Sequence, residues 1–437
     1  MKFGRQKTVS TDIKDYYSIH IRSMWEGLKQ ESAAFWWLCV YVFFEYVRPQ
    51  KIYPIIDFLP WAQVALLLAI VMAYSDRTIS LTKNPMNTIF VLFYGIVFLS
   101  MVSAFKPAIS WEGINTVLNW VIIYFLITSI VTSEKRFFIF ILLFLLVSFK
   151  MSQHGFRSFA MRGFSFSGWG VSGAPGWFQN SGEFGIQMVI FTPLSLAFVL
   201  ALREYWGGVK RFIFYMFPIT GIFSIIATSS RGALLGTAVV AVWFIVRSRV
   251  GIKALFGVVF AGLIIYSVIP SEFKAEFETM GEDSTSVHRL ELWEYGLEVV
   301  RDHPLLGIGY NNWIEYCYFV NEGGFGDTGR CHEAHNTFIE AASELGIIGF
   351  AIFVIMVVYI LKMNARSCVY AKQAKNKFLL YTAYGLNGGT VGLVVSAFFI
   401  SVLFYPFFWF QIAMTVALHE IAKKQADEIM QLENVGA

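Results

Sequence analysis

The chain has 437 residues, of which 56% are hydrophobic and only 15% are charged, and its formal net charge is +4. Soluble domains carry roughly 25% charged residues, so this composition excludes a soluble globular protein. Aromatic residues make up 18% of the chain, which is typical of helices that face lipid and end in interfacial aromatic belts. We expect an all-α polytopic membrane protein that contacts membrane lipids and binds no nucleic acid.

Apolar runs of membrane-spanning length recur along the chain and predict about 12 transmembrane helices. They are expected near residues 33–47, 58–74, 88–106, 114–132, 137–151, 184–202, 212–228, 231–247, 252–269, 335–361, 378–397 and 399–419. The last two could be divided differently, because glycines between residues 385 and 392 weaken the apolar pattern. The chain then divides into a cytoplasmic segment 1–32, a first group of spans 33–269, a large outer loop 270–334, a second group of spans 335–419 and a cytoplasmic tail 420–437.

Lysine and arginine gather in alternate loops, which sets the expected orientation. About two thirds of the 34 basic residues fall in the loops on the same side as both termini, and cytoplasmic loops carry the excess of positive charge. Both termini are therefore expected in the cytoplasm, and segments 152–183 and 270–334 outside. The first outer segment is rich in Gly, Ser, Phe and Trp, which indicates an aromatic loop at the membrane interface.

The second outer segment is long enough to hold structure of its own. Residues 285–302 have the apolar spacing of a helix and follow the polar residues 284–286, which are candidate caps. Pro304 and the turn at Gly307 and Gly309 are expected to end this helix.

His335 lies where the chain is expected to re-enter the membrane from the outer side, at the head of a long apolar helix. A helix N-terminus disfavours an added positive charge, so the ring should remain neutral. A neutral imidazole can accept a proton from an attacking hydroxyl, which is the task of a general base. The alternative is an interfacial histidine that caps its helix.

Arg231 opens another apolar helix, and this end is also expected to face outward. A guanidinium at a helix N-terminus is electrostatically unfavourable unless an anion is shared between it and the backbone N–H groups. Gly232, Ala233 and Gly236 are expected to leave room for such an anion. The alternative is an arginine that extends to the membrane surface and anchors the span.

Two further pairs of basic residues are candidates on the outer side. Arg289, next to His288, lies on the predicted helix of the large loop and is either a second phosphate ligand or a solvated arginine. Arg157 and Arg162 in the aromatic loop are ambiguous in the same way, and attraction to lipid head groups explains them more simply.

Other chemistries have weaker signals. No Walker sequence is present, which argues against a pump driven by its own ATP hydrolysis. Intramembrane acids are sparse, with Glu45 one of the few, which argues against a proton-coupled transporter. Residues 332–335 are one residue short of the H-E-x-x-H zinc spacing, and no outer Asp/Glu/His cluster has ligand spacing. We therefore expect neither a metal nor a cofactor.

The segment around His335 resembles the O-antigen ligases and their relatives. That family has His, then Asn, Ser or Gln, then nine residues, then Gly-x-x and Gly, Thr or Tyr; this chain has His335-Asn336, residues 337–345 and then Gly346-Ile347-Ile348-Gly349. Further upstream, three elements resemble the family: Ser230-Arg231-Gly232, His288-Arg289-Leu290 with Trp293, and His303-Pro304-Leu305-Leu306-Gly307-Ile308-Gly309. The likeness covers roughly residues 175–420.

The resemblance implies a GT-C-like glycosyltransferase of the bacterial inner membrane with its active site facing the periplasm. It would move a glycan (O-antigen) from undecaprenyl pyrophosphate to lipid A–core oligosaccharide, inverting the anomeric centre without a metal. His335 would be the general base, and Arg231 and Arg289 would hold the pyrophosphate. Supporting roles would fall to Asn336, His288, Arg157, Arg162 and Asn180.

The same residues leave several functions open. A Wzy-type O-antigen or exopolysaccharide polymerase would use a second lipid-linked glycan as its acceptor, and an O-linked protein glycan ligase would use a protein. A lipid-linked glycan flippase would also need a basic cavity, but it would not need a general base. The acceptor, the sugars and the oligomeric state are not encoded in any motif of the sequence.

Of the four cysteines, Cys317 and Cys331 share the large outer loop, whereas Cys39 lies in the first span and Cys368 in a cytoplasmic loop. If the outer side is a periplasm, only the first two share an oxidising compartment. The Gly-rich stretch between them could bring its ends together, which favours a disulfide. Two unpaired thiols are the alternative.

Overall fold

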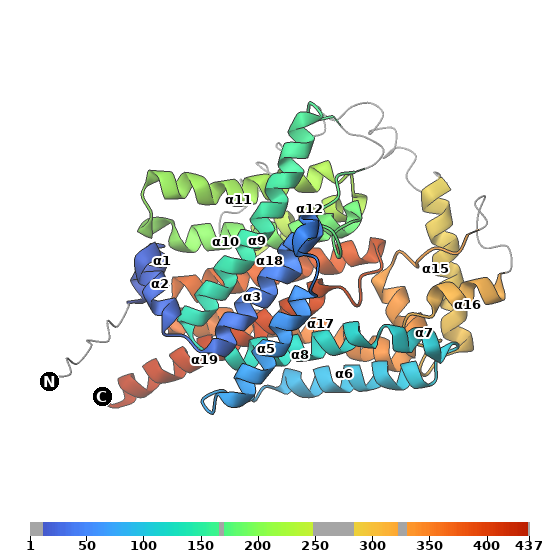
Figure 1. The fold of residues 1–437 in the computed structure, drawn as a ribbon, viewed down its shortest axis with the longest axis horizontal. Helices are drawn as coiled ribbons and strands as arrows, with labels where there is room; N and C mark the ends of the chain where they lie inside the picture. Colours follow the sequence, from blue (N-terminus) through green and yellow to red (C-terminus); the bar gives the residue numbers. More distant parts are fainter. Residues whose placement is uncertain (1–11, 166–169, 248–283, 322–329, 436–437) are drawn as a thin grey trace.

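The computed structural model describes residues 12–165, 170–247, 284–321 and 330–435. Throughout these residues the chain forms α-helices and short 3-10 turns (Figure 1). In chain order the elements are α1 (Ile13–Tyr17), α2 (Ile21–Lys29), α3 (Ala33–Val47), α4 (Pro49–Ile52), η1 (Pro54–Ile56), α5 (Trp61–Ser75), α6 (Pro85–Val102), α7 (Pro107–Glu112), α8 (Ile114–Ile130), α9 (Glu134–Met161), α10 (Ser181–Leu202), η2 (Arg203–Tyr205), α11 (Gly208–Ala227), α12 (Arg231–Arg247), α15 (Ser284–Asp302), α16 (Trp313–Val320), α17 (Thr337–Gln373), α18 (Lys377–Ser396), η3 (Ala397–Phe399) and α19 (Pro406–Val435).

The protein is an all-α polytopic membrane protein. Within the described ranges, seven helices are long and apolar enough to cross a membrane, and α8 is a shorter apolar helix. Helices α3 and α12 begin and end at the residues expected from the apolar pattern. The span expected at 252–269 lies outside the described residues.

Three helices differ most from their predicted bounds. Helix α9 continues to Met161, so the first part of the expected aromatic loop 152–183 is helical; its interior residue Gly155 packs against Ser224 of α11 instead of ending the helix. Helix α17 extends to Gln373, through most of the expected loop 362–377, because polar residues continue a helix that hydropathy alone would end. Helix α19 begins only at Pro406, because residues 400–405 form a loop.

The glycines that weaken the apolar pattern of α18 allow this helix to pack closely against its neighbours. A Cβ on Gly385 would lie 2.8 Å from the Ala197 Cβ of α10, and one on Gly392 would lie 2.7 Å from Val240 of α12. Small residues at such positions let backbones approach inside a membrane, where dispersion contacts drive helix association. The glycines are therefore part of the helix interface, and α18 is a single span.

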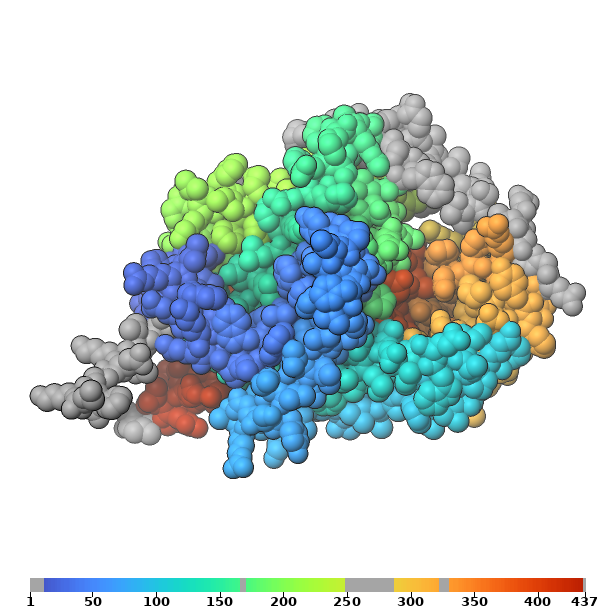
Figure 2. Space-filling view, viewed as in Figure 1, coloured from blue at the N-terminus to red at the C-terminus, as the bar shows by residue number. Residues whose placement is uncertain are grey.

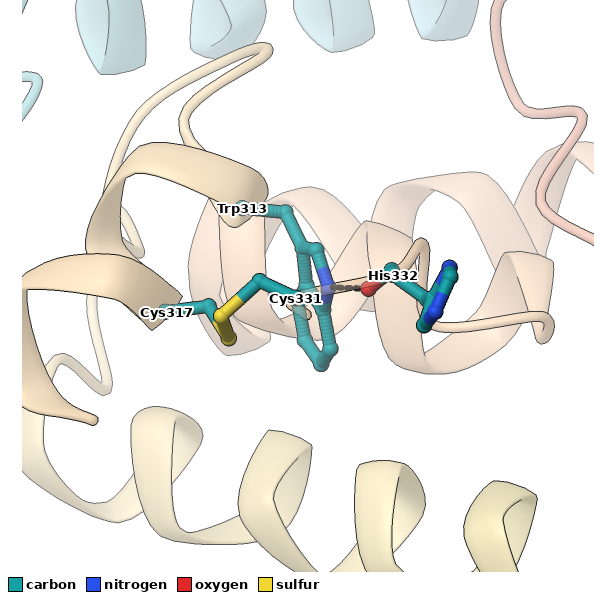
Figure 3. The surroundings of a disulfide bond; sticks show 4 residues. All are labelled: Trp313, Cys317, Cys331 and His332. Carbon is teal, nitrogen blue, oxygen red and sulfur yellow. Dashed lines mark hydrogen bonds between the residues drawn. A yellow bond between two sulfur atoms is a disulfide. The ribbon is translucent and has the colours of Figure 1, made fainter. Parts of the chain in front are cut away.

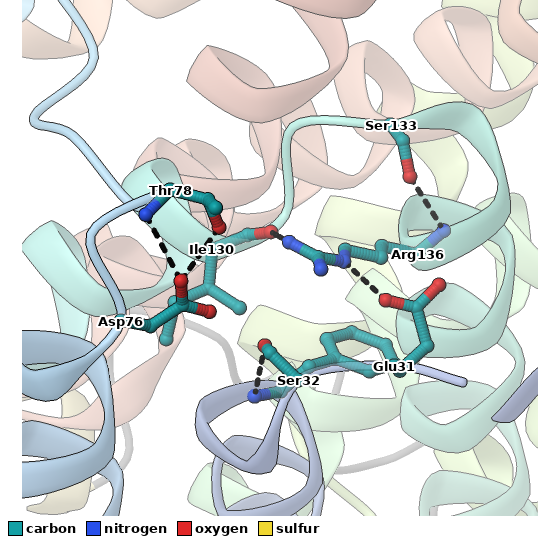
Figure 4. A network of polar contacts seen from close by, with 8 residues as sticks. Glu31, Ser32, Asp76, Thr78, Ile130, Ser133 and Arg136 are labelled. Carbon is teal, nitrogen blue, oxygen red and sulfur yellow. Dashed lines mark hydrogen bonds and ion pairs between the residues drawn. The ribbon is translucent and has the colours of Figure 1, made fainter. Parts of the chain in front are cut away.

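One end of the helix bundle is held by a polar network (Figure 4). The Arg136 Nε atom, in the first turn of α9, contacts Glu31 Oε2 at 2.5 Å, and its Nη1 donates to the Ile130 carbonyl at 3.0 Å. The Ser133 hydroxyl caps the same helix. This network joins the segment before α3 to the end of α8 and the start of α9, in a loop that was expected to be cytoplasmic.

The N-terminal helices and the C-terminal part of α19 lie at this same end (Figure 1). The Trp206 indole N–H donates to the Tyr17 carbonyl at 2.7 Å, and Glu134 accepts from Gln425 at 2.8 Å. Helices α15 and α16 lie at the opposite end (Figure 1), which is where the candidate site is found.

Candidate active site

The segment that carries His335 is held in place by two tryptophans of different helices. The Trp313 indole N–H of α16 donates to the His332 carbonyl at 2.7 Å (Figure 3). The Trp293 indole N–H of α15 donates to the Ala334 carbonyl at 3.1 Å. The position of His335 is therefore determined by both helices of the large outer loop.

A disulfide adds a covalent restraint to the same segment. Cys317 of α16 is bonded to Cys331, with 6.0 Å between their Cα atoms, as expected from their shared compartment (Figure 3). Cys39 and Cys368 are free cysteines. The bridge fixes the segment four residues before His335.

Removal of this disulfide should weaken the region around His335. Closing a loop of this length stabilises a fold by about 3 kcal/mol in the chain-entropy model. We expect Cys317→Ser/Cys331→Ser to lower the thermal unfolding midpoint, and Cys39→Ala/Cys368→Ala serves as the matched control. Mass analysis after alkylation without reductant should find no label on residues 317 and 331; label on both would show that the thiols are unpaired.

His335 itself has an unusual backbone conformation. Its φ is +47°, in the left-handed region that a residue with a Cβ rarely adopts. Such strain costs about 1–3 kcal/mol and clusters at functional sites. Next to it, the Asn336 Oδ1 atom accepts the N–H groups of Phe338 at 2.9 Å and Ile339 at 3.2 Å. Asn336 therefore caps α17 and fixes the turn that presents His335.

Gly346 of the motif and the stretch 303–309, which both resemble the family, are in contact in the structure. Gly346 has φ +67° and interrupts α17, which leaves the carbonyls of Ser343 and Glu344 available. These carbonyls accept the N–H groups of Ile308 at 2.9 Å and of Gly309 at 3.0 Å. Both stretches are thus parts of one joint between the outer loop and α17. Gly349, further along, packs against Ile96 of α6.

The predicted residues Arg231, Arg289 and His335 line one cavity of about 740 Å³, which we call the arginine cavity. Arg231 is the first residue of α12, after a turn in which Ser229 has φ +51° and the Ser230 hydroxyl accepts the Ala233 N–H at 3.3 Å. The described lining residues also include Gly170, Ser172, Gln179, Asn180, Ser181, Gly182, Ile186, Ser229, Ser230, Gly232, Ala233, Ser396, Phe399 and Ile400.

The other predicted residues are distributed unevenly around this cavity. Asn180 lines it and caps α10 through a capping box with Glu183. His288 is not among the described lining residues, and its ring centroid lies 5.3 Å from that of His332. Arg157 and Arg162 are exposed at the end of α9 and do not line the cavity.

Of the small residues after Arg231, Gly236 has a different role from the one expected, whereas Gly232 and Ala233 line the arginine cavity. A Cβ on Gly236 would lie 2.2 Å from the Ser396 hydroxyl, and the Ser396 hydroxyl donates to the Gly232 carbonyl at 3.0 Å. The expectation that Gly236 leaves room for an anion was wrong, because α18 fills this space. Gly232 both lines the cavity and packs against Phe399.

The surroundings of His335 keep its ring neutral. Burial, together with the positive charge of Arg289 and the neighbouring His332 and His288, lowers the pKa of His335 to about 4. The expectation of a neutral ring is therefore met, but burial and Arg289 are the causes rather than the end of α17.

A second cavity, of about 280 Å³, meets the arginine cavity at Asn180, His335 and Ile400. Its described lining contains Glu183, Glu333, Glu340 and Glu344, and we call it the acidic cavity. The other lining residues are Thr116, Trp177, Tyr310, Asn311, Ser401, Phe404 and Tyr405. In Figure 2 the surface is hollowed between teal, green and orange segments, with red residues at depth. These are the colours of the chain segments that line the acidic cavity.

These carboxylates were missed because intramembrane acids were judged sparse. Glu340 and Glu344 lie on α17, five and nine residues after His335, and their spacing of four residues places both on one helix face. Glu45, the intramembrane acid named in the sequence analysis, has a structural role, because it contacts Arg48 at 3.1 Å and accepts the indole N–H of Trp177.

Comparison with known proteins gives a family match for part of the chain. Residues 214–354 match the family model described as O-antigen ligase. A stretch of 199 residues is 30% identical to the exopolysaccharide production protein ExoQ of Rhizobium meliloti. Both matches are to proteins of the O-antigen ligase/polymerase type, and each covers less than half of this chain.

The match to ExoQ is partial, since it covers 41% of this chain and 43% of ExoQ, less than half the length of that relative. The family match contains Arg231, Arg289 and His335 together with the motif glycines Gly346 and Gly349. The segment that matches the O-antigen ligase model is therefore the one that contributes the cationic and imidazole groups of the arginine cavity.

Proposed function

We propose that this protein is a glycosyltransferase of the O-antigen ligase type. It moves a glycan from undecaprenyl pyrophosphate to lipid A–core oligosaccharide on the periplasmic face of the bacterial inner membrane, inverting the anomeric carbon without a metal. The observation that carries the proposal is the convergence of Arg231, Arg289 and His335 on one cavity, from three helical segments far apart in the sequence.

The arginine cavity supports the donor side of this reaction. Two guanidinium groups next to the N-terminal turn of α12 provide directed hydrogen bonds for a pyrophosphate. As the glycosidic bond breaks, negative charge grows on the leaving pyrophosphate, and the arginines offset this charge. A divalent metal fulfils that role in other phosphate sites.

His335 supports the acceptor side. Its neutral ring takes the proton of the acceptor hydroxyl while the oxygen attacks the anomeric carbon opposite the leaving group. One C–O bond forms, the bond to pyrophosphate breaks, and the pyrophosphate leaves with the electron pair. A base is most effective when its pKa is near the working pH, and the bound pyrophosphate raises the His335 pKa by opposing the charge of Arg289.

This mechanism predicts two different pH profiles. The His335 pKa of about 4 means that the free protein holds the base in its neutral form above that pH. We expect kcat/KM for the donor, which reports the free protein, to fall only as the pH drops toward 4. We expect kcat, which reports the protein with its donor bound, to fall at a higher pH. Arg289→Gln should narrow the separation between the two profiles. A kcat/KM limb at the ordinary histidine pKa, near 6.5, would contradict the assignment.

A second candidate is an exopolysaccharide polymerase, which the printed name of the relative ExoQ favours. The donor chemistry would be the same, but the acceptor would be another lipid-linked glycan. Purified protein, incubated with undecaprenyl-pyrophosphate-linked glycan and rough lipopolysaccharide, separates the two. Glycan on the lipopolysaccharide supports the ligase, longer lipid-linked glycan supports the polymerase, and neither product would refute both.

The proposed location requires a defined topology. We expect both termini and residues 374–377 to be cytoplasmic, and residues 170–180 and 330–336 to be periplasmic. Single cysteines in these segments, in a background with Cys39 and Cys368 replaced by alanine, can be labelled in intact cells with an impermeant maleimide. Label at 330–336 only after the cells are opened would overturn the proposed location.

A further inference from the structure

The acidic cavity differs from the arginine cavity in charge, although the two share His335. Of the described residues that line the acidic cavity, none is lysine or arginine, and four are glutamates. The arginine cavity contains Arg231 and Arg289 and none of these glutamates. A pyrophosphate is attracted to the two arginines, whereas the acidic cavity offers it carboxyl groups and no cation among the described lining residues, so the two cavities suit different ligands.

Two of the four glutamates are occupied by protein hydrogen bonds. Glu344 accepts the N–H groups of Asn311 at 2.9 Å and Trp313 at 3.2 Å, one on each oxygen. Glu183 accepts the Asn180 N–H at 3.2 Å and the Tyr405 hydroxyl at 2.8 Å. These two carboxylates hold the walls of the acidic cavity in place.

The other two glutamates retain hydrogen-bonding capacity toward the acidic cavity. Glu340 accepts the Leu403 N–H at 3.3 Å through one oxygen, and among the described residues its other oxygen has no partner. Glu333 is exposed and has no hydrogen-bond partner in the described part of the chain. The Ser401 hydroxyl oxygen is buried, lines the same cavity and also lacks a described partner. Buried polar atoms without partners are rare in proteins, and here a ligand can supply the missing bond.

Aromatic rings complete the lining. Trp177 packs against Tyr405 with 5.1 Å between ring centroids, and Tyr310 packs against Phe404 with 4.5 Å between them. Aromatic surface with a few placed polar groups is typical of sites for small organic ligands. A cavity of 280 Å³ lies at the small end of such sites, which are about 300–1,000 Å³. One sugar ring, with apolar ring faces and hydroxyl edges, matches this lining.

We propose that the acidic cavity is the acceptor subsite and that it selects an uncharged sugar, whose hydroxyl groups donate to Glu333 and Glu340 while another hydroxyl faces His335. The inference rests on the proposed glycosyl transfer and specifies the chemical class of its acceptor. A sugar that carries a phosphate or a carboxylate at this position would meet carboxylates and no cation, and would therefore be excluded.

The electrostatic part of the proposal can be measured with single thiols in the full-length protein. Thr116→Cys places a thiol in the acidic cavity and Ser172→Cys places one in the arginine cavity, both with Cys39 and Cys368 replaced by alanine. At position 116 we expect a cationic methanethiosulfonate reagent to react about fivefold faster than an anionic one, with the opposite order at position 172. Glu333→Gln/Glu340→Gln should abolish the preference at position 116 only.

Ligand selection is tested by protection of the same thiols. Octyl β-glucoside and octyl β-galactoside are the uncharged probes, and octyl β-glucuronide is the charged probe with the same ring. An uncharged probe at about ten times its dissociation constant should slow modification at position 116 about tenfold and leave position 172 unchanged. Protection by neither uncharged probe, or equal protection by the glucuronide, would overturn the proposal.

Failure of this inference can be distinguished from failure of the proposed function. If transfer to an acceptor is observed but position 116 is not protected, the acceptor binds elsewhere and the glycosyltransferase assignment stands. In the transfer assay, Glu333→Gln/Glu340→Gln should raise the acceptor KM and leave the donor KM unchanged. A raised donor KM in this variant would instead indicate that the acidic cavity holds part of the donor.

Discussion

His335→Ala should abolish glycan transfer while the protein still folds and still binds its lipid-linked donor. Loss of a general base typically costs about 10²–10⁴-fold in rate. The side chain of His335 lines both cavities, whereas the helix cap of α17 is made by Asn336 and the tethers of the loop run to the carbonyls of His332 and Ala334. Removing the imidazole therefore removes chemistry without removing a structural contact of the cap or of the loop.

The measurement is the rate of transfer from purified undecaprenyl-pyrophosphate-linked glycan, together with donor binding by the same preparation. His154→Ala is the matched control, because His154 is an exposed histidine of α9 that lines neither cavity. Near-normal turnover of His335→Ala would remove the general base from the mechanism. Loss of donor binding along with turnover would instead assign His335 to the pyrophosphate site.

The sequence predicts best those features that depend on local pattern. The apolar runs locate α3 and α12 to the residue, since uninterrupted hydrophobic stretches with polar flanks leave few alternatives. The helix predicted at residues 285–302 likewise corresponds to α15, which begins at Ser284 and ends at Asp302, two residues before Pro304. Prediction fails where a helix continues into polar sequence, as α9 and α17 do, because hydropathy measures contact with lipid and not helix formation.

The candidate site depends on contacts between distant segments, which local pattern does not contain. The sequence patterns identify Arg231, Arg289 and His335 individually, but their shared cavity arises only from the packing of α12, α15 and the segment before α17. For the same reason Arg157 could not be separated from Arg289, although only Arg289 lines the arginine cavity.

The acidic cavity shows a second limit of sequence analysis. Glu333, Glu340 and Glu344 follow or precede His335 within a few residues, yet each resembles an ordinary helical or loop carboxylate in the sequence. Their meaning depends on Glu183 and Tyr405, which come from α10 and from the loop before α19. A glutamate repeated every four residues inside an apolar span was the available signal, because charged groups at such positions are costly unless they have a function or a partner.

Arg231→Lys and Arg289→Lys should each lose most of the transfer activity although both keep the positive charge. The guanidinium group forms two parallel hydrogen bonds to a phosphate, whereas a lysine ammonium acts as a point charge, so the exchange is not conservative at such a site. Loss of one stabilising donor at a developing anion costs about 10²–10³-fold in kcat, and we expect losses of this size. Arg157→Lys is the matched control, since Arg157 is exposed on α9 and lines neither cavity.

In the proposed mechanism the two arginines take the role of a metal, so addition of EDTA should leave the activity of the unmodified protein unchanged. Inhibition by EDTA that a divalent ion reverses would contradict the metal-free mechanism, and full activity of both lysine variants would show that the pyrophosphate is held by charge alone.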